Sequence, residues 1–182
     1  AILSRGLGDV YKRQGLKTFH TLKPDFSWGC SNIDKLISKY NLSDYILLFP
    51  FCSEHLQQKK WPYYDQLIKL IKQNHPNLKI VIAPGPNEIE KAKKLDAVSI
   101  LKEDKAISIS ELAGLIKRSK FVVANDTGPA HMAAHLNVKG LSLFGSHTTA
   151  YKVSIERENF KAIQVSDLKN LSAEKVFERL VL

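Results

Sequence analysis

Short apolar runs alternate with amphipathic segments from residue 45 to the end of the chain. The apolar runs are strand-sized, which predicts strands over 45–49, 78–83, 98–101, 121–124, 141–144 and 160–165. Apolar residues at helical spacing between them predict helices over 62–75, 110–118, 128–136 and from Ser172 onward, with a more polar helix over 87–95. Strands that are apolar on both faces indicate a parallel sheet covered on both sides. We therefore predict an α/β fold, a Rossmann-like doubly wound parallel sheet, over residues 44–182.

The first 43 residues fit this pattern poorly. We expect residues 15–43 to be the remnant of a preceding domain and a connector, with a short helix around 32–40. Residues 1–14 are interpreted as non-native read-through, because Asp9–Gln14 can be encoded by the transposon end used to prepare sequencing libraries. The alternative is a genuine N-terminus. On the read-through interpretation Asp9 has no role, and the native sequence upstream of about Gly15 is unknown.

Composition narrows the class of protein. The chain has 182 residues, of which 44% are hydrophobic and 25% charged, as in soluble globular domains and unlike disordered chains. No apolar run approaches the roughly 20 residues of a membrane helix, and no secretory signal is evident, so we expect a cytoplasmic protein. The two cysteines form neither a disulfide framework nor a metal motif. The sequence accordingly predicts no metal and no cofactor.

The charge is strongly positive, with 27 Lys and Arg against 18 Asp and Glu, a net charge of +9. A solvated lysine-rich surface is the ordinary source of such an excess, while nucleic acid, an anionic membrane surface and a phosphate-bearing substrate are the alternatives. Aromatic residues make up only 9%, and no aromatic and basic stacking platform recurs, which argues against nucleic acid. Residues 127–155 contain no Asp or Glu, which suits a polyanionic ligand.

The loops that follow the strands are where ligands of open parallel sheets bind. The segment 125–131 follows a predicted buried strand and starts a helix, so Thr127 and Gly128 bring backbone N–H groups to an anion-binding helix N-terminus. Asp126 beside it suits sugar hydroxyls next to a phosphate. The alternative is that Asp126 or Thr127 caps the helix. His131 either faces the same ligand or packs in the core.

Two other loops add candidates. Lys59 lies just before a helix start and either reaches a phosphate as a point charge or is a surface lysine. Glu88 either accepts hydrogen bonds from ribose hydroxyls or is a helix-start carboxylate. The small polar loop 145–149 suits closure over a ligand. The sequence has no GxGxxG, Walker P-loop or nucleophile elbow, which removes support for NAD enzymes, P-loop NTPases and α/β-hydrolases.

The segment 121–134, FVVANDTGPAHMAA, followed by LSLFG at 141–145, closely resembles glycosyltransferase family 9, the ADP-heptose:lipopolysaccharide heptosyltransferases. KKWP at 59–62 resembles the family's segment of a lysine, a variable residue and Trp-Pro. The resemblance covers about 44–182. It implies the GT-B fold, which has two Rossmann-like halves with the active site between them, and this chain resembles the C-terminal, donor-binding half.

The resemblance also implies a set of donor-binding residues: Lys59, Glu88, Asp126, Thr127, Gly128 and His131. In this set the lysine meets the donor phosphates and the glutamate holds the nucleoside ribose. The aspartate contacts donor sugar hydroxyls, the threonine and glycine cradle the pyrophosphate, and the histidine supports that loop. The catalytic base of the family lies in its N-terminal half. Apart from Asp9, no residue here matches it, so the catalytic residue of the reaction is unknown.

The reaction that the resemblance implies is a metal-independent, inverting transfer of a heptose-like sugar. The partners would be an ADP-heptose-like donor and a lipopolysaccharide core or lipid A precursor acceptor, with peripheral contact at the inner membrane, and the chain alone is expected to be inactive. After Gly145 the sequence Ser-His-Thr-Thr replaces the family's common Pro-Thr-Asp-Pro, and the missing aspartate bears on sugar recognition. The alternatives are another GT-B nucleotide-sugar enzyme, such as an epimerase, or a basic non-catalytic binding domain.

Overall fold

The computed structural model of the protein describes residues 26–182. The predicted read-through segment 1–14 and the first part of the connector lie outside the described residues. The helical elements are η1 (Ser27–Gly29), α2 (Asp34–Lys39), η2 (Glu54–Lys59), α3 (Tyr64–Asn74), α4 (Ile89–Ala92), α5 (Ile109–Arg118), α6 (Gly128–His135), α7 (Ala150–Val153), η3 (Leu168–Asn170) and α8 (Ala173–Phe177). The strands are β1 (Tyr45–Phe49), β2 (Lys79–Ile82), β3 (Val98–Ser99), β4 (Leu101–Lys102), β5 (Lys105–Ala106), β6 (Phe121–Asn125), β7 (Gly140–Phe144) and β8 (Phe160–Gln164).

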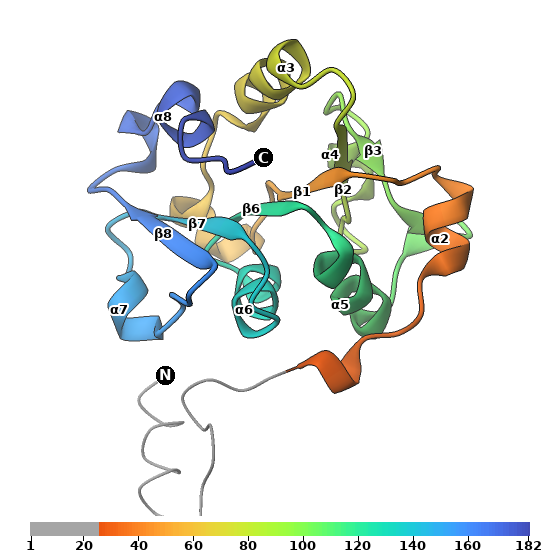
Figure 1. Ribbon diagram of the computed structural model, residues 1–182. Coiled ribbons are helices and arrows are strands. Elements are labelled where there is room, and N and C mark those ends of the chain that lie inside the picture. The colour runs from red at the N-terminus through yellow and green to blue at the C-terminus, as the bar shows by residue number, and fades with distance from the viewer. Residues whose placement is uncertain (1–25) are drawn as a thin grey trace, which may run out of the picture.

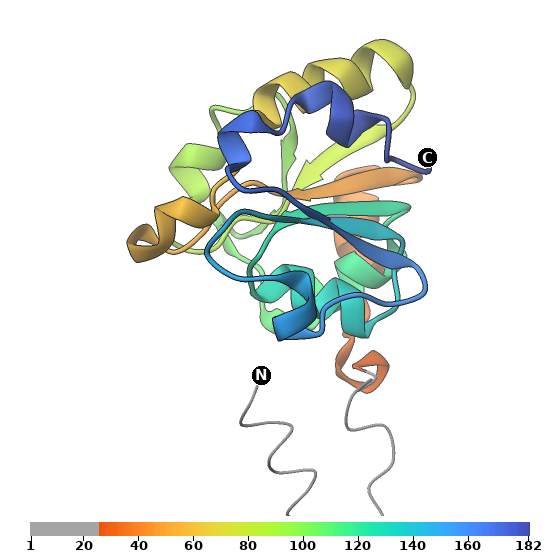
Figure 2. The same cartoon turned by 90° about the vertical axis from the view of Figure 1, so that its left-hand side faces the viewer.

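Six parallel strands form one sheet in the order β3-β2-β1-β6-β7-β8. In sequence terms this is the doubly wound order 3-2-1-4-5-6, whose direction reverses between β1 and β6. Leu47 in β1 fixes the register there, since it pairs with Val81 of β2 and Val122 of β6. Helices α3 and α8 cover one face of the sheet, and α5, α6 and α7 cover the other (Figures 1 and 2). The predicted α/β class and Rossmann-like sheet are confirmed.

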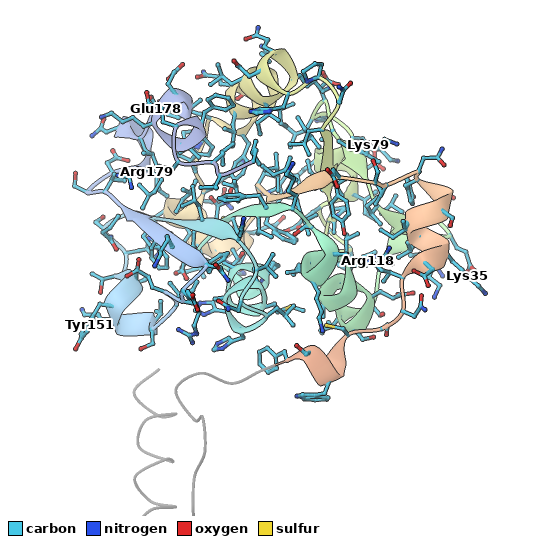
Figure 3. All side chains as sticks on the ribbon, viewed as in Figure 1. Lys35, Lys79, Arg118, Tyr151, Glu178 and Arg179 are labelled. Carbon is cyan, nitrogen blue, oxygen red and sulfur yellow. The ribbon has the colours of Figure 1, made fainter. Side chains whose placement is uncertain are left out.

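Each face of the sheet has its own apolar core, because successive side chains of a strand point to opposite faces. Ile46 and Leu48 of β1 pack with α3 and α8, whereas Leu47 and Phe49 pack with α5 and α6. Every residue of β1, β6 and β7 is buried, as expected for parallel strands covered on both sides. Figure 3 shows Lys35 of α2 at the outer edge of the molecule, away from both cores.

Several short elements differ from the sequence prediction. The strand expected over 98–101 is divided, because β3 ends at Ser99 and the chain then forms the β4–β5 hairpin through Glu103 and Asp104, both at positive φ. The helix expected over 87–95 is a single turn, α4, and both η2 and α7 were not predicted. Single-turn and 3-10 helices and the two-residue strands of a hairpin are too short for a periodic pattern to reveal them. In residues 26–182, no helix is both long enough and apolar enough to span a bilayer.

Candidate functional site

A cavity of about 480 Å³ opens at the carboxyl ends of β1, β2 and β6. It borders the point where the strand order reverses, which is where doubly wound sheets bind their ligands. Its walls are mostly apolar, with Phe49, Ile107 and Leu112 among them, and the polar side chains of Glu88 and Thr127 face it from two different loops. An apolar chamber with a few polar groups suits a flat ring joined to a polar sugar.

Glu88 is brought to this cavity by the turn between β2 and α4. It occupies the N-cap position of α4, but its side chain forms no capping hydrogen bond with that helix. Instead its Oε2 accepts a hydrogen bond from the backbone N–H of Gly85 at 2.8 Å, which braces the turn. A carboxylate has about four acceptor positions, so this bond leaves capacity for hydroxyl groups of a ligand.

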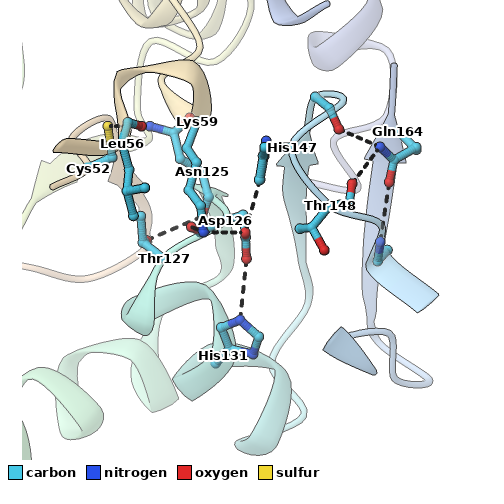
Figure 4. Close-up of polar contacts among 12 residues, drawn as sticks. Cys52, Leu56, Lys59, Asn125, Asp126, Thr127, His131, His147, Thr148 and Gln164 are labelled. Carbon is cyan, nitrogen blue, oxygen red and sulfur yellow. Dashed lines mark hydrogen bonds and ion pairs between the residues drawn. The ribbon is translucent and has the colours of Figure 1, made fainter. Parts of the chain in front are cut away.

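Beside the cavity, three side chains from different elements converge on Asp126 (Figure 4). Lys59 at the end of η2 places its Nζ 2.7 Å from Oδ2, and the same oxygen accepts a hydrogen bond from His147 Nε2 at 3.0 Å. His131 of α6 places its Nε2 3.4 Å from the other carboxylate oxygen, Oδ1. The Asp126 side chain is only 3% exposed. The carboxylate is therefore held by surrounding donors and presents little surface to solvent.

The electrostatics of Asp126 follow from this environment. Burial by itself raises the pKa of the carboxyl, but hydrogen bonds from His131, Lys59 and His147 outweigh burial and hold the pKa well below its ordinary value. Asp126 is thus a carboxylate at neutral pH. The ion pair with Lys59 is partly buried, so it is less screened than a surface pair.

A buried amide, Asn125, positions the lysine. The Asn125 Oδ1 accepts a hydrogen bond from the backbone N–H of Trp61 at 3.1 Å, so the segment after η2 is tied to the end of β6. The fully buried Trp61 donates from its indole Nε1 to the carbonyl oxygen of Leu171 at 2.7 Å. Lys59 therefore lies on a segment anchored at two places.

The start of α6 provides backbone N–H groups next to this cluster. Thr127 is the N-cap residue, yet neither it nor Asp126 caps the helix with its side chain, and Thr127 Oγ1 instead donates to the Asn125 carbonyl at 3.2 Å. Simple side-chain capping therefore does not explain Asp126. A Cβ added at Gly128 would have no other atom within 4 Å, so the space around this glycine is open.

The structure thus places the six predicted residues in two adjoining groups. Lys59, Asp126 and His131 are in contact through the carboxylate, while Glu88 and Thr127 line the cavity, with Gly128 following directly. The prediction missed Asn125 and His147. The signal for Asn125 was its place directly after a predicted buried strand, and the signal for His147 was its place in the loop after the neighbouring strand. In the described part of the chain, no group of His, Cys, Asp and Glu side chains could hold a metal ion.

Known structures share this fold. The E. coli heptosyltransferase WaaC with ADP superposes with a TM-score of 0.70 at 23% identity, over 92% of this chain and 52% of that one. The E. coli ADP-heptose lps heptosyltransferase II gives 0.66 at 18% identity, over 90% and 51%. A UDP-GlcNAc 2-epimerase from Methanocaldococcus jannaschii gives 0.53 at 18% identity, over 81% and 42%. The chain spans about half the length of these heptosyltransferases.

The fold is shared by heptosyltransferases and an epimerase, and sequence comparison distinguishes between these families. Over 114 residues the chain is 29% identical to lipopolysaccharide heptosyltransferase 1 of Campylobacter coli, which covers 58% of this chain and 33% of that protein. Residues 11–179 match the sequence profile of glycosyltransferase family 9 (heptosyltransferase). This match extends over most of the chain and includes both the anchored lysine and the cluster around the buried aspartate, so the resemblance seen in the sequence is confirmed: the chain belongs to glycosyltransferase family 9.

Proposed function

We propose that this chain is the donor-binding half of a glycosyltransferase that moves a heptose-like sugar from an ADP-sugar to a lipopolysaccharide core or lipid A precursor. The observation that carries the proposal is that Thr127, the N-cap residue of α6, lines the cavity, while Lys59 is paired with Asp126, the residue directly before Thr127. Family membership and the fold shared with WaaC, which has been solved with ADP and with ADP-2-deoxy-2-fluoro heptose, support the choice of donor.

The donor would lie across the site from the cavity to the Asp126 cluster. The adenine ring of the donor occupies the apolar cavity, and Glu88 accepts hydrogen bonds from the ribose hydroxyls. The diphosphate lies at the start of α6, where Thr127 and Gly128 offer backbone N–H groups at the positive end of the helix dipole. Lys59 supplies the charge that a diphosphate needs. The sugar then lies on the side of Asp126 and His131.

This arrangement assigns the chain one part of the reaction. In an inverting transfer a base deprotonates the acceptor hydroxyl while the sugar leaves its diphosphate. Lys59 and the N–H groups of α6 would stabilise the charge that develops on that leaving group, without a metal. We place the base and the acceptor site in the other half of a GT-B enzyme. The chain alone would therefore bind the donor without transferring it.

The domain boundaries belong to the same proposal. We propose residues 44–182 as the nucleotide-sugar domain, 15–43 as the remnant of a preceding domain with its connector, and 1–14 as read-through. Ile33, Leu36 and Leu42 of the connector pack into the core of the nucleotide-sugar domain. Because the acceptor is a lipid-linked saccharide, we propose that the enzyme works from the cytoplasm at the inner membrane surface. Neither alternative class, an epimerase or a basic non-catalytic binding domain, requires this donor and acceptor.

The decisive experiment compares two neighbouring lysines by calorimetric titration with ADP. Lys59→Met should weaken ADP binding by about 1–3 kcal/mol, because a charge-assisted hydrogen bond to phosphate is lost. Lys60→Met removes the same charge from an exposed side chain one residue away and should leave the affinity unchanged. Equal effects of the two variants would reduce Lys59 to a general surface charge. Tighter binding of UDP-GlcNAc or of single-stranded DNA than of ADP would favour the alternative classes.

A further inference from the structure

The β7–α7 loop, which contains His147, is held by a polar side chain from the next strand. The Gln164 amide of β8 donates to the carbonyl oxygens of Gly145 at 2.7 Å and Thr148 at 3.1 Å, and its Oε1 accepts from the N–H of Ala150 at 3.2 Å (Figure 4). The His147 ring stacks on Phe144, with ring centroids 6.1 Å apart and planes within 12°. The loop on both sides of His147 is therefore braced, and the imidazole is fixed.

The three donors around Asp126 differ in their freedom to leave it. The side chain of Lys59 is 22% exposed and that of His131 is 35% exposed, so both can turn towards a ligand. The side chain of His147 is only 7% exposed and its ring stacks on Phe144, so it has less room to turn away. Because a carboxylate only accepts hydrogen bonds, the contact at Oδ2 places a proton on His147 Nε2. His147 is thus the one donor of this set that stays with Asp126.

We propose that His147 is a positioning residue that holds the Asp126 carboxylate so that Lys59 can pass from Asp126 to the donor diphosphate. The proposal rests on the proposed function, since it concerns binding of the same donor. It adds a residue that lies outside the predicted set and that acts through Asp126 and Lys59 without touching the donor.

The physical argument compares Asp126 before and after the lysine moves. Before binding, its Oδ2 accepts from both Lys59 and His147. When the ammonium moves to a phosphate, the buried carboxylate loses that partner, and a buried charge with too few hydrogen bonds is costly. The N–H of His147 remains on the same oxygen and limits that cost. Without it, Asp126 would retain Lys59 more strongly, and the diphosphate would bind less well.

A packing role for His147 is the competing explanation, because the ring is buried against Phe144. Two variants separate the explanations. His147→Phe keeps a flat ring for the stack but removes the N–H donor. His147→Gln gives up the ring but places an amide N–H near the position of Nε2. If His147 acts by packing, the phenylalanine variant should bind ADP more tightly than the glutamine variant does. If it acts through its hydrogen bond, the glutamine variant should bind ADP more tightly.

The experiment titrates the full chain with ADP and with adenosine by calorimetry. We expect His147→Phe to weaken ADP binding about tenfold, at the low end for a lost hydrogen bond to a charged group, and His147→Gln to remain within about threefold of the wild type. Adenosine, which has no phosphate, should bind all three proteins equally. In the Lys59→Met background, His147→Phe should change ADP affinity by less than about twofold, because its effect acts through the lysine.

The outcomes separate the two proposals. Binding of ADP by the wild type, with His147→Phe unchanged or with the same loss in the Lys59→Met background, overturns the role of His147 alone. Absence of ADP binding to the wild type overturns the proposed function and the positioning role together. Circular dichroism and thermal unfolding establish that each variant is folded. If His147→Phe does not fold, His147→Met removes the same donor with a flexible side chain, and the same tenfold loss is expected.

Discussion

Helices α5 and α6 both begin at the edge of the same cavity, but their N-termini are built differently. At α5, Ser108 and Glu111 form a capping box, in which Ser108 Oγ accepts from the Glu111 N–H at 3.3 Å and Glu111 Oε2 accepts from the Ser108 N–H at 2.9 Å. At α6, Thr127 provides no side-chain cap. The first helix start is satisfied by its own side chains. At the second, Pro129 has no N–H and the N–H groups of Ala130 and His131 donate to the Thr127 carbonyl, so the backbone donors left for another partner are those of the residues before Pro129.

The glycines of the two helices differ in the space around them, one lying against other residues and the other facing open space. A Cβ at Gly114 in α5 would lie 2.5 Å from the backbone oxygen of Ser31 and 3.0 Å from Ile33 Cγ2, so the glycine is required by packing. A Cβ at Gly128 in α6 would touch nothing in the described part of the chain. Two helices beside one cavity thus use the same residue type for different purposes, one to fit the fold and the other to keep a surface open.

The largest effects are expected when each of these two glycines is replaced by alanine. Gly114→Ala should lower the free energy of unfolding by about 1–3 kcal/mol, because the methyl group meets backbone and over-packs the core. Gly128→Ala should leave stability equal or raise it by up to about 1 kcal/mol, since alanine is the better helix former. The same Gly128→Ala change should weaken ADP binding about tenfold, because the methyl group occupies the approach to the helix N–H groups.

Urea denaturation and calorimetry measure the two quantities on the same samples. Gly114→Ala, examined below its unfolding transition, serves as the control for ADP binding and should retain wild-type affinity. The comparison would break down if Gly128→Ala bound ADP as well as the wild type does, since the open space would then have no bearing on the donor.

A smaller effect is expected from the two N-cap residues. Ser108→Ala removes the side-chain acceptor of the capping box and should cost about 1 kcal/mol of stability, with no change in ADP affinity. Thr127→Ala removes only the hydroxyl that donates to the Asn125 carbonyl and should cost about half as much. Chemical denaturation of both variants checks the order. The reverse order would mean that Thr127 stabilises α6 more than its contacts indicate.

The sequence predicted the parts of the fold that have strong periodicity. The six strands of the sheet and helices α3, α5 and α6 were located to within two residues, because a buried parallel strand reads as a continuous apolar run and an amphipathic helix has a period. The β4–β5 hairpin was not found, since strands of two residues have no pattern and Glu103 and Asp104 are unusual residues for two successive left-handed positions.

The candidate site was predicted in position but not in its contacts. The sequence predicts Asp126 from its place in the segment 125–131, and Lys59 from its place before a helix start. Nothing in the sequence shows that these two residues, which are 67 positions apart, form an ion pair. His147 was passed over because its contact with Asp126 depends on the neighbouring strands β6 and β7 ending side by side. Pairings between distant loops are set by strand order, which a local pattern does not contain.

The smallest expected effect tests whether the closed start of α5 is structural only. Hydrogen bonds from Lys102 and Ser108 lower the pKa of Glu111 from its ordinary 4.5 to about 2, so the charged form stabilises the folded state above about pH 4.5 and this contribution is lost as the pH falls towards 2.

Glu111→Gln keeps an acceptor for the capping box and removes the charge. The Lys102 partner is more than half exposed, so the loss at pH 7 should stay below about 1 kcal/mol. The difference from the wild type should shrink towards zero as the pH falls from 4.5 to 2, because Glu111 is then protonated and as neutral as the glutamine. Asp126 titrates equally in both proteins, so its contribution cancels. Urea denaturation across this range measures the difference, Glu158→Gln controls for loss of an exposed charge, and ADP affinity at pH 7 should be unchanged. A difference that persisted at pH 2, or a change in ADP affinity, would place a ligand-related role at α5 and remove the contrast with α6.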